Sequence, residues 1–118
     1  MVKQLEPIQH LQKSVRQELE DILQFWIQYA VDLENGGFFG EISNDLHINK
    51  TAPKGLVLNA RILWTFSKAY TLFKDVKYLD IARRAYEYLV HFFWDTEHEG
   101  YYWHVDELGN VSWREAQG

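Results

Sequence analysis

Residues 32–42 read DLENGGFFGEI, and residues 95–105 read DTEHEGYYWHV. The two stretches share an aspartate, a glutamate and a glycine at equivalent places, and three further positions match in type. The similarity extends upstream into apolar segments at residues 23–31 and 86–94, always at an offset of 63 residues. A repeat of this length, in which a helix leads into a glycine-containing turn, is typical of stacked or closed arrays of helical hairpins. The repeat predicts an all-α fold with two short β-hairpins between helices.

Three segments carry apolar residues at the spacing of a helix stripe. The first covers residues 8–33, with Pro7 in its first turn, where a proline is tolerated. The second covers residues 56–73 and is apolar on more than one side, so neighbouring elements should cover it. The third covers residues 77–94, and the short connection before it predicts an antiparallel pair.

The two β-hairpins are expected at residues 36–48 and 100–112, the second with its turn at Leu108-Gly109-Asn110. The second repeat reaches Gly118 before the helix that should follow its hairpin. We therefore expect residues 1–118 to form a single incomplete domain of about two helical repeats. Its uncovered apolar faces predict marginal stability and self-association. The alternative is a small three-helix domain whose hairpins are similar by chance.

The composition excludes several classes of protein. Of the 118 residues 47% are hydrophobic and 16% aromatic, which is typical of a folded chain. A net charge of −5 argues against a nucleic-acid partner, and the absence of cysteine excludes disulfides and thiolate chemistry. The N-terminal residues are too polar for a signal peptide, and no apolar run is long enough to span a membrane. A soluble, cytoplasmic protein is expected.

One charged residue interrupts the apolar stretch GLVLNARILWTF at residues 55–66, and that residue is Arg61. Arginine is rarely fully buried unless it is paired. Its stem can lie along the helix surface, its charge can pair with Glu41 or Asp45 of the first hairpin, or it can face a polar cavity. Trp64 follows one helical turn later and would face the same side.

The stretch GGFFGEISNDLHINKTAPKGLVLNARILWTFSKAY at residues 36–70, with YYWHVDELGN at residues 101–110, resembles the N-acylglucosamine 2-epimerase family. The resemblance is greatest to its cellobiose 2-epimerase branch. It implies an (α/α)6 barrel, of which this chain would be the N-terminal portion. It also implies a cofactor-free isomerase that inverts C2 of an aldose, or of the reducing-end glucose of a β-1,4-disaccharide such as cellobiose.

Inversion at C2 requires an open-chain aldehyde, a base that removes the C2 proton, and an acid that returns a proton to the opposite face. A fixed positive charge would stabilise the enediolate that forms in between. Arg61 is the catalytic candidate, because its guanidinium can bridge two sugar oxygens and because it matches the arginine of the family's active site. Trp64, Trp103 and Tyr102 are the substrate-binding candidates, since aromatic rings stack on the C–H faces of sugars.

The family's two acid/base histidines lie far downstream of the residues present here, which implies that the 118-residue chain is inactive by itself. No histidine pair has metal-ligand spacing and no carboxylate cluster completes a site, so no metal is expected. All five histidines are interpreted as surface or structural residues: His10, His47, His91, His98 and His104.

Two other function classes remain open. A glycoside hydrolase or lyase on the same toroid would need a pair of carboxylates. Asp32, Glu34, Asp95 and Glu97 occupy equivalent helix ends, where capping or hairpin structure explains them better. A non-catalytic sugar-binding helical module would use exposed aromatic side chains instead.

Overall fold

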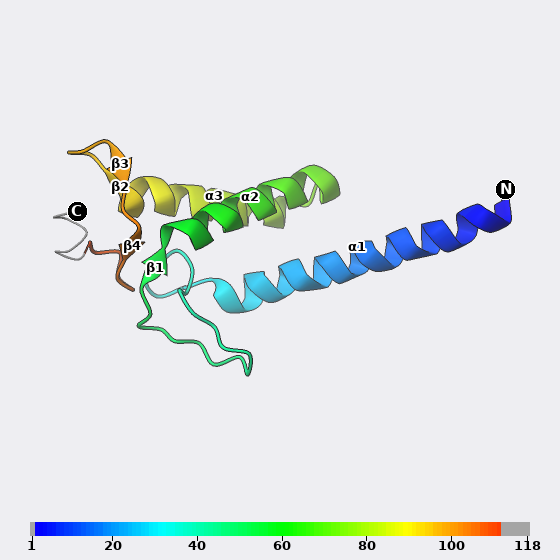
Figure 1. Cartoon of the computed structure of the whole chain (residues 1–118), viewed down its shortest axis with the longest axis horizontal. Helices are drawn as coiled ribbons and strands as arrows, with labels where there is room; N and C mark the ends of the chain where they lie inside the picture. The colour runs from blue at the N-terminus through cyan, green and yellow to red at the C-terminus, as the bar shows by residue number, and fades with distance from the viewer. Residues whose placement is uncertain (1, 112–118) are drawn as a thin grey trace.

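The computed structural model describes residues 2–111, with side chains from residue 6 onward. Three α-helices, one π-helical turn and four two-residue strands make up this part of the chain (Figure 1). In chain order they are α1 (Val2–Ala30), β1 (Lys54–Gly55), α2 (Leu56–Phe73), α3 (Val76–Tyr88), η1 (Leu89–Phe93), β2 (Trp94–Asp95), β3 (Gly100–Tyr101) and β4 (His104–Val105). The predicted all-α class is confirmed.

Helices α2 and α3 lie side by side and antiparallel, as the short connection predicts (Figure 1). Helix α2 has the expected bounds and ends at Phe73, and the left-handed φ of 58° at the next residue, Lys74, turns the chain. Asp75 then caps α3 by accepting a hydrogen bond from the Lys77 amide at 3.0 Å. The main core lies between these helices and the second half of α1. Its buried members are Leu23, Ala30, Phe38, Ile62, Phe66, Ala69, Tyr78, Ala82 and Ala85.

Helix α1 differs from its predicted bounds at both ends. It begins at Val2, so Pro7 lies inside the helix, and the predicted first-turn position of Pro7 is wrong. It ends at Ala30 instead of residue 33, because the next residues form the first turn. There Val31 bridges Phe38, and the Asp32 amide donates to the Gly37 carbonyl at 3.0 Å.

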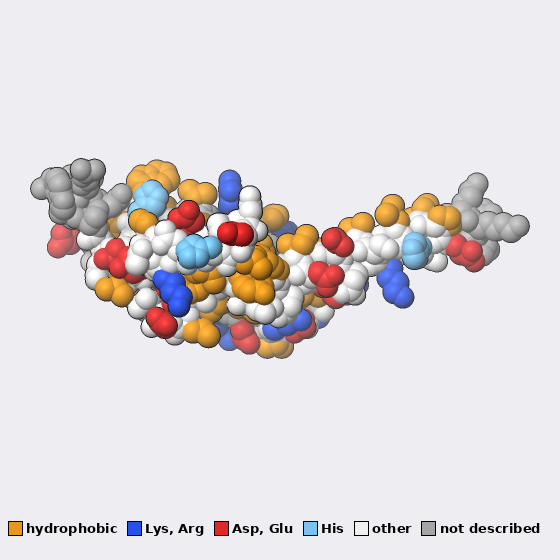
Figure 2. Space-filling view, turned by 90° about the horizontal axis from the view of Figure 1, so that it is seen from below, with side chains coloured by type: hydrophobic (Ala, Val, Ile, Leu, Met, Phe, Trp, Pro, Cys, Tyr) orange, Lys and Arg blue, Asp and Glu red, His pale blue; other side chains and the backbone are white. Residues whose placement is uncertain are grey.

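The first half of α1 extends away from the rest of the molecule (Figures 1 and 2). The radius of gyration is 17.8 Å, whereas a compact domain of this length has a value of about 13–14 Å. Its apolar stripe is therefore largely uncovered by the described residues, and Figure 2 shows apolar side chains along the projecting end. The exposed members in the projecting half are Ile8, Leu11 and Val15, and the stripe continues with exposed Leu19, Ile22 and Trp26 in the second half of α1.

The outer face of α2 is also exposed. Val57, Trp64 and Leu72 are each at least half accessible to solvent, so the expectation that neighbours cover α2 on all sides is wrong within residues 2–111. Tertiary packing inside the described part of the chain covers only the face that holds Asn59, Ile62, Phe66 and Ala69. No helix of this part combines the length and the apolar character that crossing a membrane requires.

The two predicted hairpins form with less strand structure than expected. In the first, Ile42 bridges Ile48 as an isolated pair. In the second, β2 pairs with β3 across a turn, while β4 pairs antiparallel with the distant β1. The expected turn is present at Gly109, which has a φ of 92°. The hairpin was expected to extend to residue 112, and that end of it lies outside the described residues.

Candidate functional site

Arg61 and Trp64 share an open groove along the exposed face of α2. The groove has a volume of about 580 Å³. Because the two residues are three positions apart on one helix, they project from the same side. The remaining walls come from the same helix: Leu56, Val57, Ala60 and Thr65.

A second groove, of about 340 Å³, brings residues from distant parts of the sequence together. It lies between the start of α2 and the segment that leads into β4. Arg61 borders it from the helix, and Trp103 and His104 border it from the other side. The Leu56 amide donates to the Trp103 carbonyl at 2.9 Å, which fixes the distance between the two walls. Two of the three aromatic candidates, Trp64 and Trp103, therefore lie in grooves that Arg61 borders.

The Arg61 side chain is exposed, and it has no ion pair or hydrogen bond with any residue in the described part of the chain. Neither proposed carboxylate partner contacts it. Glu41 accepts a hydrogen bond from Asn49 at 3.1 Å, and Asp45 accepts one from Ser43. The interpretation of Arg61 as a tie to the first hairpin is wrong.

Arg61 also borders a groove lined mainly by apolar side chains. A third groove, of about 320 Å³, runs between α1 and α2, and Arg61 borders it together with Trp26 and Ile62. An exposed arginine that borders an apolar groove can lay its methylene stem along the groove and keep its guanidinium in solvent. A planar charged group in this position can donate two parallel hydrogen bonds to a ligand in either neighbouring groove.

The two tryptophans expose most of their surface, 65% for Trp64 and 63% for Trp103. The Lys68 ammonium lies 5.9 Å from the Trp64 ring centre, so a second cation borders that ring. Exposed indole rings beside an arginine provide an apolar face and hydrogen-bond donors together, which suits a polyhydroxylated ligand with C–H faces.

Tyr102 does not line the grooves that Arg61 borders. It is half-buried, and burial together with the neighbouring Asp95 carboxylate raises the pKa of its phenol. Its role as a substrate-binding residue stays a prediction, with support only from its place next to Trp103 in the chain.

His104, which the sequence analysis interprets as a surface or structural residue, is an exposed polar side chain that borders the second groove. It lies over Gly55, where an added Cβ would meet the imidazole at 3.7 Å. Its place depends on the pairing of β1 with β4, which joins residues 49 and 51 positions apart in the sequence. No local pattern reveals such a pairing. Within the described residues, no three metal-ligating side chains lie close enough together to hold an ion.

A buried charged cluster beside this site was also missed. The Lys54 ammonium donates to Asp32 Oδ2 at 2.9 Å and to the Gly36 carbonyl at 2.7 Å. Both side chains of the pair are only 1% exposed. Burial raises the pKa of Asp32, but the hydrogen bond and charge of Lys54 and the backbone amides of the turn outweigh burial, so this pKa lies below its ordinary value.

Arg84 of α3 closes the same cluster from the other side. Its guanidinium donates to the Asp32 carbonyl at 2.6 Å and to the Gly37 carbonyl at 3.0 Å. The Lys54 ammonium lies 5.3 Å from the ring centre of Tyr88, and burial raises the pKa of the Tyr88 phenol to about 12.

The four carboxylates considered for a hydrolase do not form an acid/base pair in the described structure. Asp32 is occupied by Lys54, and Asp95 accepts hydrogen bonds from the backbone and side chain of its own turn. The predicted role in hairpin structure is confirmed for Asp32 and Asp95, whose carboxylates accept hydrogen bonds from the amides of their turns. Glu34 and Glu97 point into solvent.

Comparison with known proteins places these features in a family. Residues 37–116 match the model of the N-acylglucosamine 2-epimerase (GlcNAc 2-epimerase) family. The chain is 43% identical over 100 residues to the cellobiose 2-epimerase of Bacteroides fragilis, covering 84% of this chain and 26% of that protein. It is 47% identical over 90 residues to the cellobiose 2-epimerase of Eubacterium cellulosolvens, covering 76% and 22%.

A solved sugar epimerase from a ruminal bacterium superposes with a TM-score of 0.79 at 42% identity, over 85% of this chain and 26% of that one. The structural relatives of this chain are (α/α)6 barrels, so the predicted fold class is confirmed. The chain spans about a quarter of the length of the relatives that it matches. The match over residues 37–116, with the same helices and turns, shows that the chain belongs to the N-acylglucosamine 2-epimerase family.

Proposed function

We propose that this chain forms the arginine-bearing wall of a carbohydrate 2-epimerase. The observation that carries the proposal is the accessible Arg61 guanidinium, which is unpaired within the described residues and borders grooves that hold Trp64 and Trp103. The substrate is an aldose or a disaccharide with a reducing-end glucose, cellobiose being the example that the relatives' names give.

The proposed reaction inverts one carbon without loss of mass. The sugar ring opens to expose the C1 aldehyde, a base removes the C2 proton, and the electron pair moves onto the aldehyde oxygen to give an enediolate. A proton then returns to C2 from the opposite face, and the carbonyl reforms. Arg61 donates hydrogen bonds to the oxygens on which negative charge develops.

The tryptophans are proposed to hold the sugar. Their exposed rings offer flat apolar surfaces on either side of Arg61, and stacking on C–H faces leaves the hydroxyl groups free for polar partners. Tyr102 is proposed to support Trp103 from the neighbouring position.

The chain by itself is proposed to be inactive. Removal and return of a proton on opposite faces uses two titratable groups with pKa values near neutrality. Of the residues that line the grooves beside Arg61, His104 is the one histidine. A single such group cannot serve both faces of C2.

The experiment that tests the proposal uses a chimera in which residues 6–111 replace the matching segment of the Bacteroides fragilis cellobiose 2-epimerase. Arg61→Lys keeps the charge but loses the planar fork, so kcat/KM for cellobiose should fall by about 10²–10³, which is the effect of losing an oxyanion donor. The melting temperature should change little, because the guanidinium packs against no partner. Product analysis by NMR measures conversion of cellobiose to glucosylmannose.

Arg83→Lys is the matched control, since Arg83 is an exposed arginine on α3, outside the grooves, and its substitution should leave kcat/KM unchanged. The 118-residue chain alone should give no product. A folded chimera that never epimerises cellobiose contradicts the proposal, and release of free glucose would favour a hydrolase. Sugar binding without any product would favour a binding module.

The uncovered apolar stripe of α1 supports one further proposal, that the 118-residue chain self-associates. Sedimentation velocity at increasing concentration should show species larger than 14.1 kDa. Leu11→Gln/Val15→Gln should reduce association, and a monomer at all concentrations would contradict the proposal. We also propose a cytoplasmic location, with which the lack of cysteine in the sequence is compatible, and cell fractionation tests that location.

A further inference from the structure

Lys54 is a buried lysine that the proposed reaction does not use. Its side chain points away from the grooves and into the first turn, where it contacts Asp32 and the Gly36 carbonyl and lies beside the Tyr88 ring. A lysine that is 1% exposed is unusual, because its ammonium loses its hydration and must be compensated by close partners.

The backbone of Lys54 has different partners from its side chain. Lys54 pairs with Val105, and Gly55 pairs with His104, in the two-residue ladder of β1 and β4. The next amide, that of Leu56, donates to the Trp103 carbonyl. Both walls of the second groove are therefore attached to the strand that begins with Lys54.

The segment that leads into Lys54 is held tightly on its other side. A Cβ added at Gly40 would lie 1.9 Å from the Pro53 carbonyl oxygen, so the first hairpin crosses the chain at contact distance. The side chain of Lys54 and the crossing at Gly40 thus fix one short stretch of backbone from two directions.

A two-residue ladder specifies its own register weakly. A slip by one residue would turn every side chain to the other face and would move Trp103 away from Arg61. The ion pair opposes such a slip, since it would pull the ammonium away from Asp32 and leave both charges buried without partners.

We propose that the Lys54–Asp32 pair is a positioning pair, which holds β1 in register with β4 and so keeps Trp103 and His104 opposite Arg61. The pair contacts no substrate and acts through the strand pairing. The importance of this geometry for a sugar rests on the proposed function, but the geometry itself can be tested without any sugar.

The test measures amide hydrogen exchange by NMR in the 118-residue chain, since the Leu56 amide reports directly on its bond to Trp103. Asp32→Asn/Lys54→Met removes both charges and leaves neither one buried alone. We expect exchange at Leu56 to become at least about tenfold faster, while exchange at Phe66, in the buried face of α2, changes by less than about threefold. The indole N–H signal of Trp103 should also shift.

A merely structural role gives a different result. If the pair only stabilised the whole fold, the double substitution would speed exchange at Leu56 and Phe66 by the same factor and leave the Trp103 signal in place. That result would overturn the proposal. The matched control is Arg16→Met/Glu20→Gln, which removes an exposed ion pair on α1 and should leave Leu56 unchanged.

If the double variant does not fold, Asp32→Glu gives the same comparison, because it keeps both charges and lengthens the carboxylate arm by one methylene. Exchange about threefold faster at Leu56 alone supports the positioning pair, and unchanged exchange overturns it.

Cellobiose titrated into the wild-type chain, with the Trp103 signal as readout, tests the groove separately. Absence of a cellobiose effect would count against the proposed function and leave the Leu56 result to decide the positioning pair.

Discussion

The turns at residues 32–37 and 95–100 have the same backbone and different surroundings. In each, the aspartate carboxylate accepts hydrogen bonds from the amides two and three residues later, at 2.9–3.3 Å. In each, the aspartate carbonyl accepts from the amide four residues later, at 3.1 Å and 2.9 Å. The residue at that fourth place has a left-handed φ in both copies, Gly36 in the first and Glu99 in the second.

The correspondence continues on both sides of the turns. The amide of Phe39 donates to the Ala30 carbonyl, and the amide of Tyr102 donates to the Phe93 carbonyl, at 2.8 Å and 2.9 Å. At the hairpin tips, left-handed φ values occur at Leu46 and at Gly109, again 63 residues apart. The repeat seen in the sequence is therefore also a repeat of backbone hydrogen bonds.

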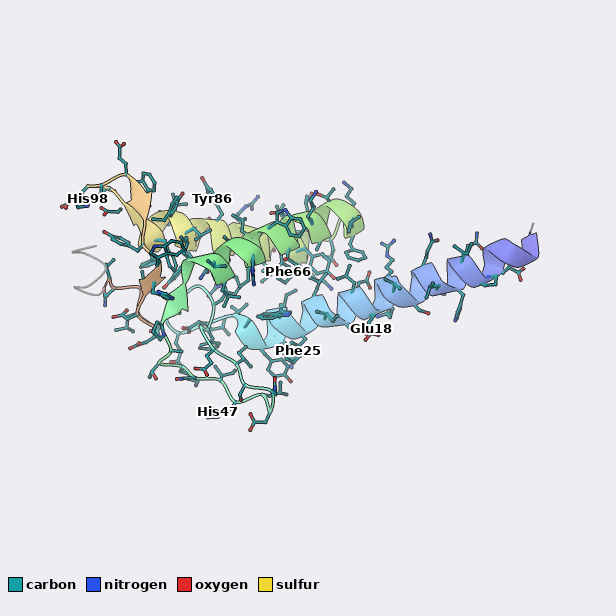
Figure 3. The ribbon with its side chains drawn as sticks, in the orientation of Figure 1. Glu18, Phe25, His47, Phe66, Tyr86 and His98 are labelled. Atoms are coloured by element: carbon teal, nitrogen blue, oxygen red, sulfur yellow. The ribbon has the colours of Figure 1, made fainter. Side chains whose placement is uncertain are left out.

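The two copies differ in what surrounds the aspartate. Asp32 is buried and paired with Lys54, whereas Asp95 pairs with His98, whose side chain is 71% exposed. Figure 3 shows His98 at the outer end of its turn, away from the helices. The local sequence determines the backbone conformation of the turn. Contacts with distant residues determine whether the turn is buried in the fold or exposed as a surface loop.

The largest expected difference between the copies concerns the aspartates. Asp32→Asn leaves the Lys54 ammonium buried without its counter-ion, so the free energy of unfolding should fall by about 3–5 kcal/mol. Asp95→Asn keeps the oxygen that accepts the turn amides and loses only an accessible contact with His98, so its effect should be much smaller. Urea denaturation of both variants measures the difference, and equal losses would contradict the contrast.

Substituting alanine for the equivalent glycines of the two turns should change the free energy of unfolding by amounts that differ almost as much. An alanine Cβ at Gly37 would lie 2.7 Å from the Tyr88 ring, on a residue with a φ of 64°. Gly37→Ala should therefore reduce the free energy of unfolding by about 2–4 kcal/mol. At Gly100 an added Cβ meets nothing within 4 Å, so Gly100→Ala should stay within about 0.5 kcal/mol of the wild type. A tolerated Gly37→Ala would show that the Tyr88 ring moves aside easily.

The smallest expected effect is a pH dependence confined to the second copy. The hydrogen bond and charge of Asp95 raise the pKa of His98 above 6.5. Burial raises the pKa of Asp95, but the hydrogen bonds from His98 and from backbone amides outweigh burial and hold that pKa below 3.8. A histidine whose pKa is higher in the folded than in the unfolded protein stabilises the fold at pH values below its unfolded-state pKa. This contribution is lost as the pH rises through its folded-state pKa. The contact should therefore stabilise the fold between about pH 4 and 6.5 and weaken above.

Asn35 occupies the place of His98 in the first copy, which suggests the matched variant His98→Asn. The difference in melting temperature between pH 6 and pH 8 should be smaller in this variant than in the wild type. His47→Asn, in a loop far from this turn, serves as control and should keep the wild-type difference (Figure 3). If His98→Asn keeps the wild-type difference in melting temperature between pH 6 and pH 8, the His98–Asp95 pair contributes nothing measurable to folding.

The local features of this fold follow from the sequence, and the distant pairings do not. The bounds of α2 were predicted because its apolar spacing and the turn at Lys74 are local signals. Helix α1 begins at Val2, earlier than predicted, and runs through Pro7 although proline cannot donate the backbone hydrogen bond of a helix interior. The pairing of β1 with β4 joins segments about 50 residues apart, and four residues carry too little pattern to reveal it.

The same distinction applies to the site. Arg61 and Trp64 share a groove because of helix geometry, which the sequence fixes locally. Trp103 was singled out for its residue type, but its place opposite Arg61 depends on the strand pairing. Lys54 was missed because a lysine in a polar segment before a helix normally faces solvent, and nothing nearby in the sequence indicates its buried partner.

The Arg84 contacts also have a consequence for the order of events during synthesis. The Arg84 guanidinium reaches the Asp32 carbonyl across 52 residues of chain. Ribosomes add about 5–20 residues per second, so the first turn would wait roughly 3–10 s between its own synthesis and the arrival of that arginine. During that interval the turn has its local hydrogen bonds and the contacts of Lys54, which is made 22 residues after Asp32, but it lacks both hydrogen bonds from Arg84. The nascent first repeat therefore stays open to chaperones and proteases on the Arg84 side until much of the second repeat has emerged.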